Sequence, residues 1–274
     1  MPTKTRTKKL SKKNPLLQVP VKKEDRLKTY RGHWQKEIQE HKAELRGEVI
    51  NPSEFRSGKA TWRIFRIMAE FVEGYDFLSK LTADITIFGS ARIRPGSKYY
   101  HLAEEICRLL AKKGFSIVTG GGPGIMEAAN KGAYEAGGES IGINIQLPFE
   151  QRINDYVHHG MGFHFFFTRK VMLTSPAQAF IAFPGGYGTM NEIFEVLTLI
   201  QTHKMQPVPI ILVGKEFWGG LYTFIKEQML DENKAINAKD LELFTIVDSA
   251  KEVMEVIKKN VVAHDNAPEI SKKA

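Results

Sequence analysis

The chain has 274 residues, a formal net charge of +8 and 42% hydrophobic residues, so it is long and apolar enough for one sizeable α/β domain with attachments. No apolar run approaches the ~20 residues of a membrane span, and the basic N-terminus lacks the hydrophobic stretch of a secretory signal. Cys107 is the single cysteine, which excludes an internal disulfide and fits a reducing cytosol. We therefore predict a cytoplasmic protein.

The positive charge belongs to the start of the chain. Residues 1–50 hold 14 Lys and Arg against 6 Asp and Glu, and the rest is balanced. Residues 1–22 carry no acidic side chain, and we predict a disordered basic tail there. Such a tail can contact RNA or an anionic surface, although a solubilising role is the favoured interpretation. The balanced body has no nucleic-acid footprint.

Residues 23–82 are predicted to form a helical extension. A charged segment, Trp34 to Arg46, has a thin apolar face and is expected to lie on the surface as a helix. The segment from Thr61 to Leu81 repeats apolar residues at helical spacing, which predicts a helix that packs on the body or on a second subunit. The residues of this apolar stripe are Trp62, Phe65, Met68, Ala69, Val72, Tyr75 and Leu78.

From residue 83 to 262, short apolar runs alternate with segments of helical periodicity. Strands are expected at 84–88, 115–119, 140–145, 179–183, 207–213 and 243–247. Helices are expected at 98–113, from 125, at 169–173, from the turn at 184–188 to 202, at 217–230 and at 249–258. This alternation predicts an open, mostly parallel sheet with helices on both faces. Residues 263–274 are polar and are predicted to form a loose tail.

Three turns that follow predicted strands point to a ligand site. They are Gly89-Ser90-Ala91-Arg92, Gly120 to Gly124, and Pro184 to Gly188. Glycine amides approach a ligand closely, and a helix that follows adds unpaired N–H groups, so the last two turns favour an anion such as a phosphate. At the carboxyl ends of parallel strands, such turns can face one crevice. Neither glycine turn matches a standard dinucleotide or P-loop pattern.

Each of these features also has a structural interpretation. Thr189-x-x-Glu192 can act as a capping box, and many glycine turns between a strand and a helix bind nothing. The run from Gln151 to Phe167 holds His158 and His159, but no carboxylate or cysteine stands at ligand spacing, so no metal site is predicted. Phe165, Phe166 and Phe167 are expected to form a wall that encloses an apolar base.

The ordered motifs resemble the LOG (Lonely Guy) family, whose members have been labelled lysine decarboxylases. Pro184 to Glu192 matches the PGGxGTxxE motif of that family, and Gly120 to Ala128 resembles its other glycine motif. Thr168-Arg169-Lys170, with Met172 close behind, resembles its Arg-Lys segment. The resemblance spans residues 85 to 230. Asn191 stands where the family commonly has a second glutamate.

The resemblance implies a Rossmann-like domain and a phosphoribohydrolase that splits a nucleoside 5′-monophosphate into free base and ribose 5-phosphate. The substrate would be AMP or a cytokinin riboside monophosphate. Arg169 and Glu192 are the expected catalytic residues, with Lys170 as a member of a structural ion pair. The expected binding residues are Ser90, Gly121, Gly122, Met126, Gly185, Gly186, Gly188 and Thr189. No cofactor is implied, and the expected assembly is a homodimer or a higher homo-oligomer.

Two other functions remain open. A carrier of a nucleotide or of the molybdenum cofactor can use the same fold and the same glycine turns, but it need not keep Arg169 and Glu192. A nucleic-acid protein can use the basic tail. The label of lysine decarboxylase finds no support, because no lysine lies in a recognisable pyridoxal-phosphate context.

Overall fold

The structure is a computed structural model that describes residues 63–81, 84–145, 153–175 and 177–261. All of these residues belong to one compact unit, Gly47–Ala274. The predicted basic tail at 1–22, the predicted helix at 34–46 and the predicted C-terminal tail lie outside the described residues.

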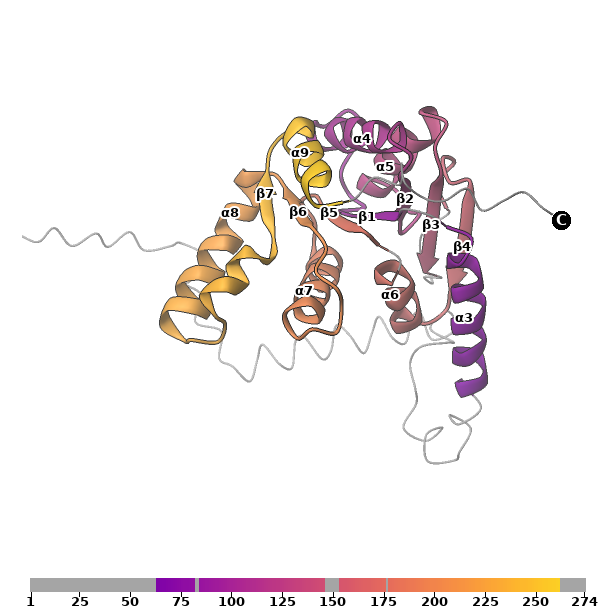
Figure 1. Cartoon of the computed structure of the whole chain (residues 1–274). Coiled ribbons are helices and arrows are strands. Elements are labelled where there is room, and N and C mark those ends of the chain that lie inside the picture. The colour runs from indigo at the N-terminus through magenta and orange to yellow at the C-terminus, as the bar shows by residue number, and fades with distance from the viewer. Residues whose placement is uncertain (1–62, 82–83, 146–152, 176, 262–274) are drawn as a thin grey trace, which may run out of the picture. The chain divides into compact units, whose positions relative to one another are not determined.

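Within this part of the chain, seven strands form one parallel sheet in the order β4-β3-β2-β1-β5-β6-β7 (Figure 1). The prediction of an open, mostly parallel sheet is confirmed. Five strands are buried along their whole length, as expected for a sheet that is covered on both faces. The strands are β1 Asp84–Phe88, β2 Ser116–Thr119, β3 Ser140–Ile145, β4 His159–Phe163, β5 Ala179–Ala182, β6 Ile210–Val213 and β7 Thr245–Val247.

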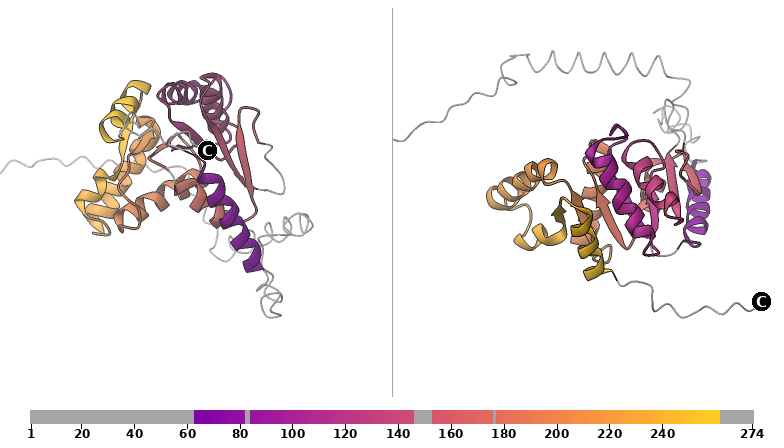
Figure 2. Two further views of the ribbon diagram at one scale, coloured as in Figure 1. Left: turned by 45° about the vertical axis from the view of Figure 1, so that its right-hand side comes forward. Right: turned by 90° about the horizontal axis from the view of Figure 1, so that it is seen from above.

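Helices cover both faces of the sheet, as predicted (Figures 1 and 2). On one face lie α4 (Lys98–Ala111), α5 (Ile125–Glu135) and α9 (Ala250–Asn260). On the other lie α3 (Arg63–Leu78), α6 (Phe166–Thr174), α7 (Tyr187–Gln201) and α8 (Lys215–Phe224). After α8 the chain forms a π-helix, Ile225–Glu232, and later a 3₁₀-helix, Ala238–Leu243. None of the described helices combines the length and apolarity that a membrane crossing requires.

Several elements differ from the predictions. Strand β4 was not predicted, because its sequence His-Gly-Met-Gly-Phe has two glycines and, at the sheet edge, only Phe163 is buried. Helix α6 begins at Phe166, earlier than expected, so part of the phenylalanine run is helical. The last strand was expected at 243–247, but Leu243 ends the 3₁₀-helix and the strand covers only Thr245–Val247.

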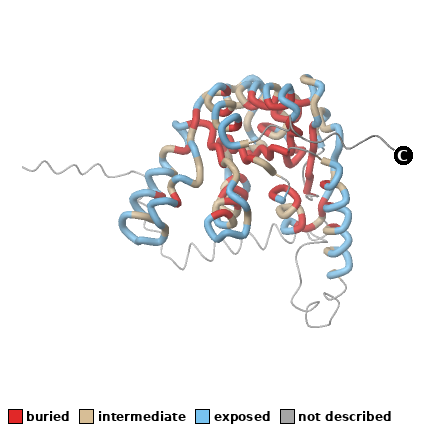
Figure 3. Tube along the Cα trace, viewed as in Figure 1, coloured by how far each residue is buried: buried red, intermediate tan, exposed pale blue. Residues whose placement is uncertain are grey.

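Helix α3 buries a different face from the one that its apolar stripe suggests. Phe65, Met68, Val72 and Tyr75 are all more than half exposed, and Figure 3 shows most of this helix as exposed. The buried residues are Glu70 and Gly74, which lie outside the stripe and contact α6, and Leu78, the last residue of the stripe. The prediction that this helix packs on the body is thus confirmed, through Leu78 of the stripe and through the face beside it, whereas the alternative contact with a second subunit, like the expected homo-oligomer, stays a prediction.

The contact between α4 and α5 depends on Gly132. A Cβ atom at this position would overlap the carbonyl oxygen of Glu104 and lie 3.1 Å from the amide nitrogen of Arg108. Because these atoms belong to the backbone of α4, they cannot move aside without shifting the helix. We expect Gly132→Ala to lower the free energy of unfolding by about 1–3 kcal/mol in chemical denaturation.

Gly220→Ala is a matched control for this prediction. Gly220 lies in α8, and a Cβ atom added to it would have no neighbouring atom within 4 Å. There alanine should raise the free energy of unfolding by up to about 1 kcal/mol, through helix propensity alone. Equal effects of the two substitutions would show that close packing at Gly132 does not matter.

Candidate functional site

Three turns meet where β1, β2 and β5 end. The amide of Ser90, just after β1, donates to the carbonyl of Pro184, just after β5, at 3.1 Å. The carbonyl of Ser90 accepts from the amide of Ile125, the first residue of α5, also at 3.1 Å. The backbone of Ser90 therefore joins the three turns. From β1 the successive strands β2, β3 and β4 are added on one side of the sheet, and β5, β6 and β7 on the other. Open α/β sheets form ligand crevices at the point between β1 and β5 where this strand order reverses.

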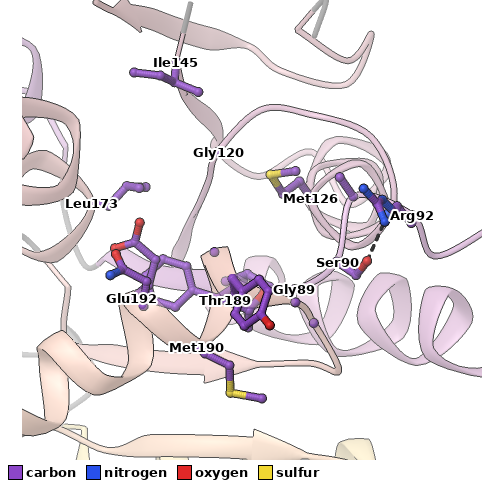
Figure 4. Close-up of a pocket in the computed structure, with 18 of the residues that line it drawn as sticks. Gly89, Ser90, Arg92, Gly120, Met126, Ile145, Leu173, Thr189, Met190 and Glu192 are labelled. Atoms are coloured by element: carbon purple, nitrogen blue, oxygen red, sulfur yellow. Dashed lines mark hydrogen bonds between the residues drawn. The ribbon is translucent and has the colours of Figure 1, made fainter. Parts of the chain in front are cut away.

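A pocket of about 990 Å³ opens at this point (Figure 4). It is lined from both halves of the sheet, by the turns after β1 and β5 and by the first turns of α5, α6 and α7. Among the predicted site residues, those that line it are Ser90, Met126, Arg169, Gly185, Gly186, Gly188, Thr189 and Glu192. Two predicted binding residues, Gly121 and Gly122, are not part of the lining.

Gly121 and Gly122 shape the turn after β2. Gly121 has a φ of +70°, which favours glycine, and its amide donates to Thr119 Oγ1 at 2.8 Å. Asn154 holds both carbonyl groups: its backbone amide donates to the carbonyl of Gly121 at 2.8 Å, and its Nδ2 donates to that of Gly122 at 3.0 Å. The glycine of this turn that lines the pocket is Gly120.

The N-terminus of α7 faces the pocket. The helix is capped by Gly186 without a side-chain hydrogen bond, and its first intrahelical bond runs from the amide of Met190 to the carbonyl of Gly186 at 3.0 Å. Thr189 thus lies inside the first turn, so the capping box with Glu192 is not formed. The amides before Met190 have no intrahelical acceptor, which makes this helix start suited to an anion.

Arg169 comes from the first turns of α6. Its Nε donates to the carbonyl of Ile143 on β3 at 2.7 Å, and its Nη2 lies against Gly120, where a Cβ atom would overlap it. Burial lowers the pKa of Arg169, and the nearby Glu192 carboxylate opposes that shift. The guanidinium is therefore a fixed, poorly hydrated cation on the pocket wall.

Glu192 is buried, at 8% exposure, and still lines the pocket. Within the described residues, its Oε2 has no hydrogen-bond partner. Burial raises the pKa of Glu192, and Glu195 adds to that shift, while the charges of Arg169 and Lys170 oppose it. A buried carboxylate with a free oxygen beside a cation is suited to stabilise positive charge or to take a proton.

Lys170 has a structural partner, as predicted. Its Nζ lies 2.5 Å from Oε2 of Glu195, one turn beyond Glu192 on α7. Lys170 is not part of the pocket lining, although its neighbour Arg169 is. The two adjacent basic residues point in different directions, as expected from the 100° step of a helix.

One end of the pocket is apolar. Figure 4 shows Ile145 and Leu173 on the side of Glu192, and Ser90 and Arg92 at the opposite end, with Gly120 between them. Of the predicted phenylalanine wall, only Phe166 lines the pocket. Phe165 is buried elsewhere, and the ring of Phe167 lies 6.5 Å from that of Phe71 on α3.

Gly120, Ile145 and Leu173 line the pocket but were not among the predicted binding residues, although Gly120 belongs to a turn that was expected to face it. The sequence could have indicated Leu173, because it stands four residues after Arg169 and thus lies on the same face of α6. Gly120 had a weaker signal, since it directly follows the strand. Ile145 had none, because its position in the pocket depends on the arrangement of the whole sheet.

The sequence and the fold are similar to those of known proteins. A family model described as "Possible lysine decarboxylase" matches residues 126–257. A relative from Rhodococcoides fascians, named cytokinin riboside 5′-monophosphate phosphoribohydrolase, is 31% identical over 170 residues, which cover 58% of this chain and 85% of the relative. A rice relative (Oryza sativa subsp. japonica), named as a probable enzyme of the same kind, is 30% identical over 172 residues, with 61% and 79% covered.

A solved structure shares the fold. The X-ray structure titled TM1055 superposes with a TM-score of 0.50 at 24% identity, and the match covers 65% of this chain and 99% of that one. At this identity the likeness shows the α/β architecture alone, in agreement with the sheet described above.

Proposed function

This chain belongs to the LOG family, and from that premise we propose that it is a phosphoribohydrolase of nucleoside 5′-monophosphates. The observation that carries the proposal is the meeting of Glu192 and Arg169, from two neighbouring helices, in one pocket with the turns after β1 and β5. In the reaction, water adds to C1′ of the ribose, the N-glycosidic bond breaks, and the base leaves with a proton. AMP and cytokinin riboside monophosphates are the candidate substrates.

The 5′-phosphate is assigned to the start of α7. Gly185, Gly186, Gly188 and Thr189 lie at this helix end, and Ser90 is joined to the same turn by the bond from its amide to the carbonyl of Pro184. Amides and a positive dipole end favour a phosphate there. Because the phosphate is remote from the bond that breaks, its binding energy can serve to orient the ribose.

Glu192 is assigned to the ribose, one helical turn beyond the phosphate. Cleavage of an N-glycosidic bond develops positive charge on the ribose, as in other glycoside hydrolysis. An ionised Glu192 can stabilise that charge or accept the proton of the attacking water. Arg169, fixed by the carbonyl of Ile143, is assigned to the departing base. The base then points toward the apolar end formed by Ile145, Phe166 and Leu173.

The test is base release by the purified full chain. The protein is incubated with AMP, GMP, CMP, UMP and N6-isopentenyl AMP, and with the corresponding nucleosides, and free base is followed by chromatography. We expect at least one monophosphate to be hydrolysed with a kcat/KM at least about a hundredfold above that of its nucleoside, because the nucleoside lacks the group that orients it.

The same assay separates the alternatives. Tight nucleotide binding without base release from any monophosphate would favour a carrier protein. Equal rates for nucleoside and monophosphate would contradict the phosphate assignment at α7. Deletion of residues 1–22 should leave base release intact, and any RNA binding lost with it would belong to the tail.

A further inference from the structure

Helix α6 begins without a cap of its own. Its N-cap residue is Phe165, whose side chain cannot accept a hydrogen bond. Helix starts are normally satisfied by a nearby Ser, Thr, Asp or Asn, because the first amides have no acceptor within the helix. The acceptor here comes from outside the local sequence.

Glu70 of α3 supplies an acceptor for the amide of the N-cap residue Phe165 and for the amide of His164 just before it. Its Oε1 accepts from the amide of His164 at 2.8 Å, and its Oε2 accepts from the amide of Phe165 at 3.3 Å. Oε2 also accepts from the hydroxyl of Thr168 at 2.6 Å, inside the first turn of α6. Glu70 is only 8% exposed. Its carboxylate also lies at the positive end of the α6 dipole, which adds a favourable charge interaction.

The capped residues connect directly to Arg169. The amide of Arg169 donates to the carbonyl of Phe165 at 3.3 Å, so its backbone is tied to a residue that Glu70 holds. The side chain then reaches the pocket between two fixed points, the carbonyl of Ile143 and the turn at Gly120. A shift at the start of α6 would therefore move the guanidinium away from both.

Helix α3 is seated closely on α6. One turn after Glu70, Gly74 packs so tightly that a Cβ atom there would lie 2.6 Å from Sδ of Met172. Helix α3 also lies outside the residues 126–257 that the family model matches. It is thus an attachment to the matched region that contacts the helix carrying Arg169.

We propose that Glu70 is a positioning residue for the proposed reaction: from α3, it caps α6 and thereby holds Arg169 in its place in the pocket. The effect of Glu70 on turnover rests on the proposed function, because it assumes that Arg169 takes part in the reaction. The position of Arg169 itself can be measured without any substrate.

The kinetic test is a double-mutant cycle with Glu70→Ala and Arg169→Lys in the full-length protein. Glu70→Ala should lower kcat/KM by about tenfold to a hundredfold, since small misplacements of a catalytic group have effects of this size. In the Arg169→Lys background the same change should have little further effect. An equal loss in both backgrounds, or no loss in either, would overturn the proposal.

Two further variants accompany this cycle. Glu73→Ala removes an exposed carboxylate from the same helix and should leave kcat/KM unchanged. Glu70→Gln keeps one acceptor oxygen in a side chain of the same size, so it should lose less activity than Glu70→Ala. If Glu70→Ala does not fold, Glu70→Gln replaces it in the double-mutant cycle.

A spectroscopic test separates this inference from the proposed function. The Nε–H of Arg169, bonded to Ile143, should give a slowly exchanging signal in ¹⁵N NMR, identified by its loss in Arg169→Lys. Glu70→Ala should shift or broaden that signal, and Glu73→Ala should not. If the signal changes in Glu70→Ala only, but the protein releases no base, the positioning role of Glu70 is supported and the proposed phosphoribohydrolase function is contradicted. If base release occurs and the signal is unchanged in Glu70→Ala, the positioning role fails and the function stands.

Discussion

The Glu192→Gln variant is expected to lose at least about a thousandfold in kcat on a nucleoside monophosphate, with KM little changed. Glutamine has nearly the same shape but carries no charge and accepts no proton. If Glu192 stabilises the ribose cation or activates water, the loss appears in the transition state and not in substrate binding. Steady-state kinetics and substrate titration measure the two effects separately.

The stability of this variant is expected to match or exceed that of the wild type. Burial raises the pKa of Glu192, so its ionised form is held in the folded protein at a cost. Glutamine removes that cost, and Oε2, the atom that lacks a partner, is replaced by an amide group. A lower midpoint of thermal unfolding together with lost activity would therefore indicate a folding defect and not a catalytic role.

Glu195→Gln is the matched control. It lies one turn further along α7, outside the pocket lining, and pairs with Lys170. This variant should keep most of the activity at neutral pH. Because Glu195 raises the pKa of Glu192, its removal should also move the acidic limb of the pH–rate profile to lower pH. Undiminished activity of Glu192→Gln would contradict the catalytic assignment.

The Asp84→Asn variant is expected to unfold at higher denaturant concentration than the wild type at pH 7. Asp84 is the first residue of β1 and is 2% exposed. Within the described residues, its Oδ1 has no hydrogen-bond partner. Burial raises the pKa of Asp84 to about 6, against an opposing effect of a hydrogen bond with Ser116. The ionised carboxylate is therefore unfavourable in the folded state.

The sign of the pH dependence follows from this shift. The unfolded chain releases the proton of Asp84 near its ordinary pKa of 3.8, and the folded chain only near 6. Stability thus falls as the pH rises from about 4 to about 6 and stays low above it. At pH 7 the gain from Asp84→Asn should be about 3 kcal/mol in free energy of unfolding, and it should vanish below about pH 4.

Asp240→Asn provides the opposite case. Its Oδ2 accepts from the amide of Asn237 and from Nε2 of Gln201, each at 2.8 Å, and the first of these contacts is the main cause of its lowered pKa. The same substitution should therefore destabilise the protein at pH 7. If both variants respond alike to pH between 4 and 7, burial of Asp84 does not govern the effect.

Much of the fold follows from local patterns, because interior strands of a parallel sheet are continuous apolar runs. The strands before the three turns were predicted within a residue or two, and these turns are where the pocket forms. The edge strand β4 was not predicted, since its two glycines and its mostly exposed side chains do not give the apolar pattern of a strand. It pairs with β3 along its whole length, from His159 opposite Ile141 to Phe163 opposite Ile145.

The unpredicted features of the site depend on distant contacts. Nothing near Phe165 indicates that α6 takes its cap from Glu70, which lies 95 residues earlier. Likewise, most of the apolar stripe of α3 is exposed, and the buried face carries Glu70 and Gly74, which have no apolar side chain for a sequence pattern to detect. In the turn after β2, all three glycines look alike in sequence, but Gly121 and Gly122 are bound by Asn154 through their carbonyls and Gly120 is the one that lines the pocket.

The order of the strands has a consequence for synthesis on the ribosome. β1 pairs on one side with β2, but its other neighbour is β5, with Ile85 opposite Ala179, 94 positions later. The edge of β1 that pairs with β5 therefore stays without a partner strand while the ribosome synthesises β2, β3 and β4. Contacts between segments this far apart in the sequence form slowly. The pocket lies across this seam, so it is completed only after the chain beyond Glu192 has emerged.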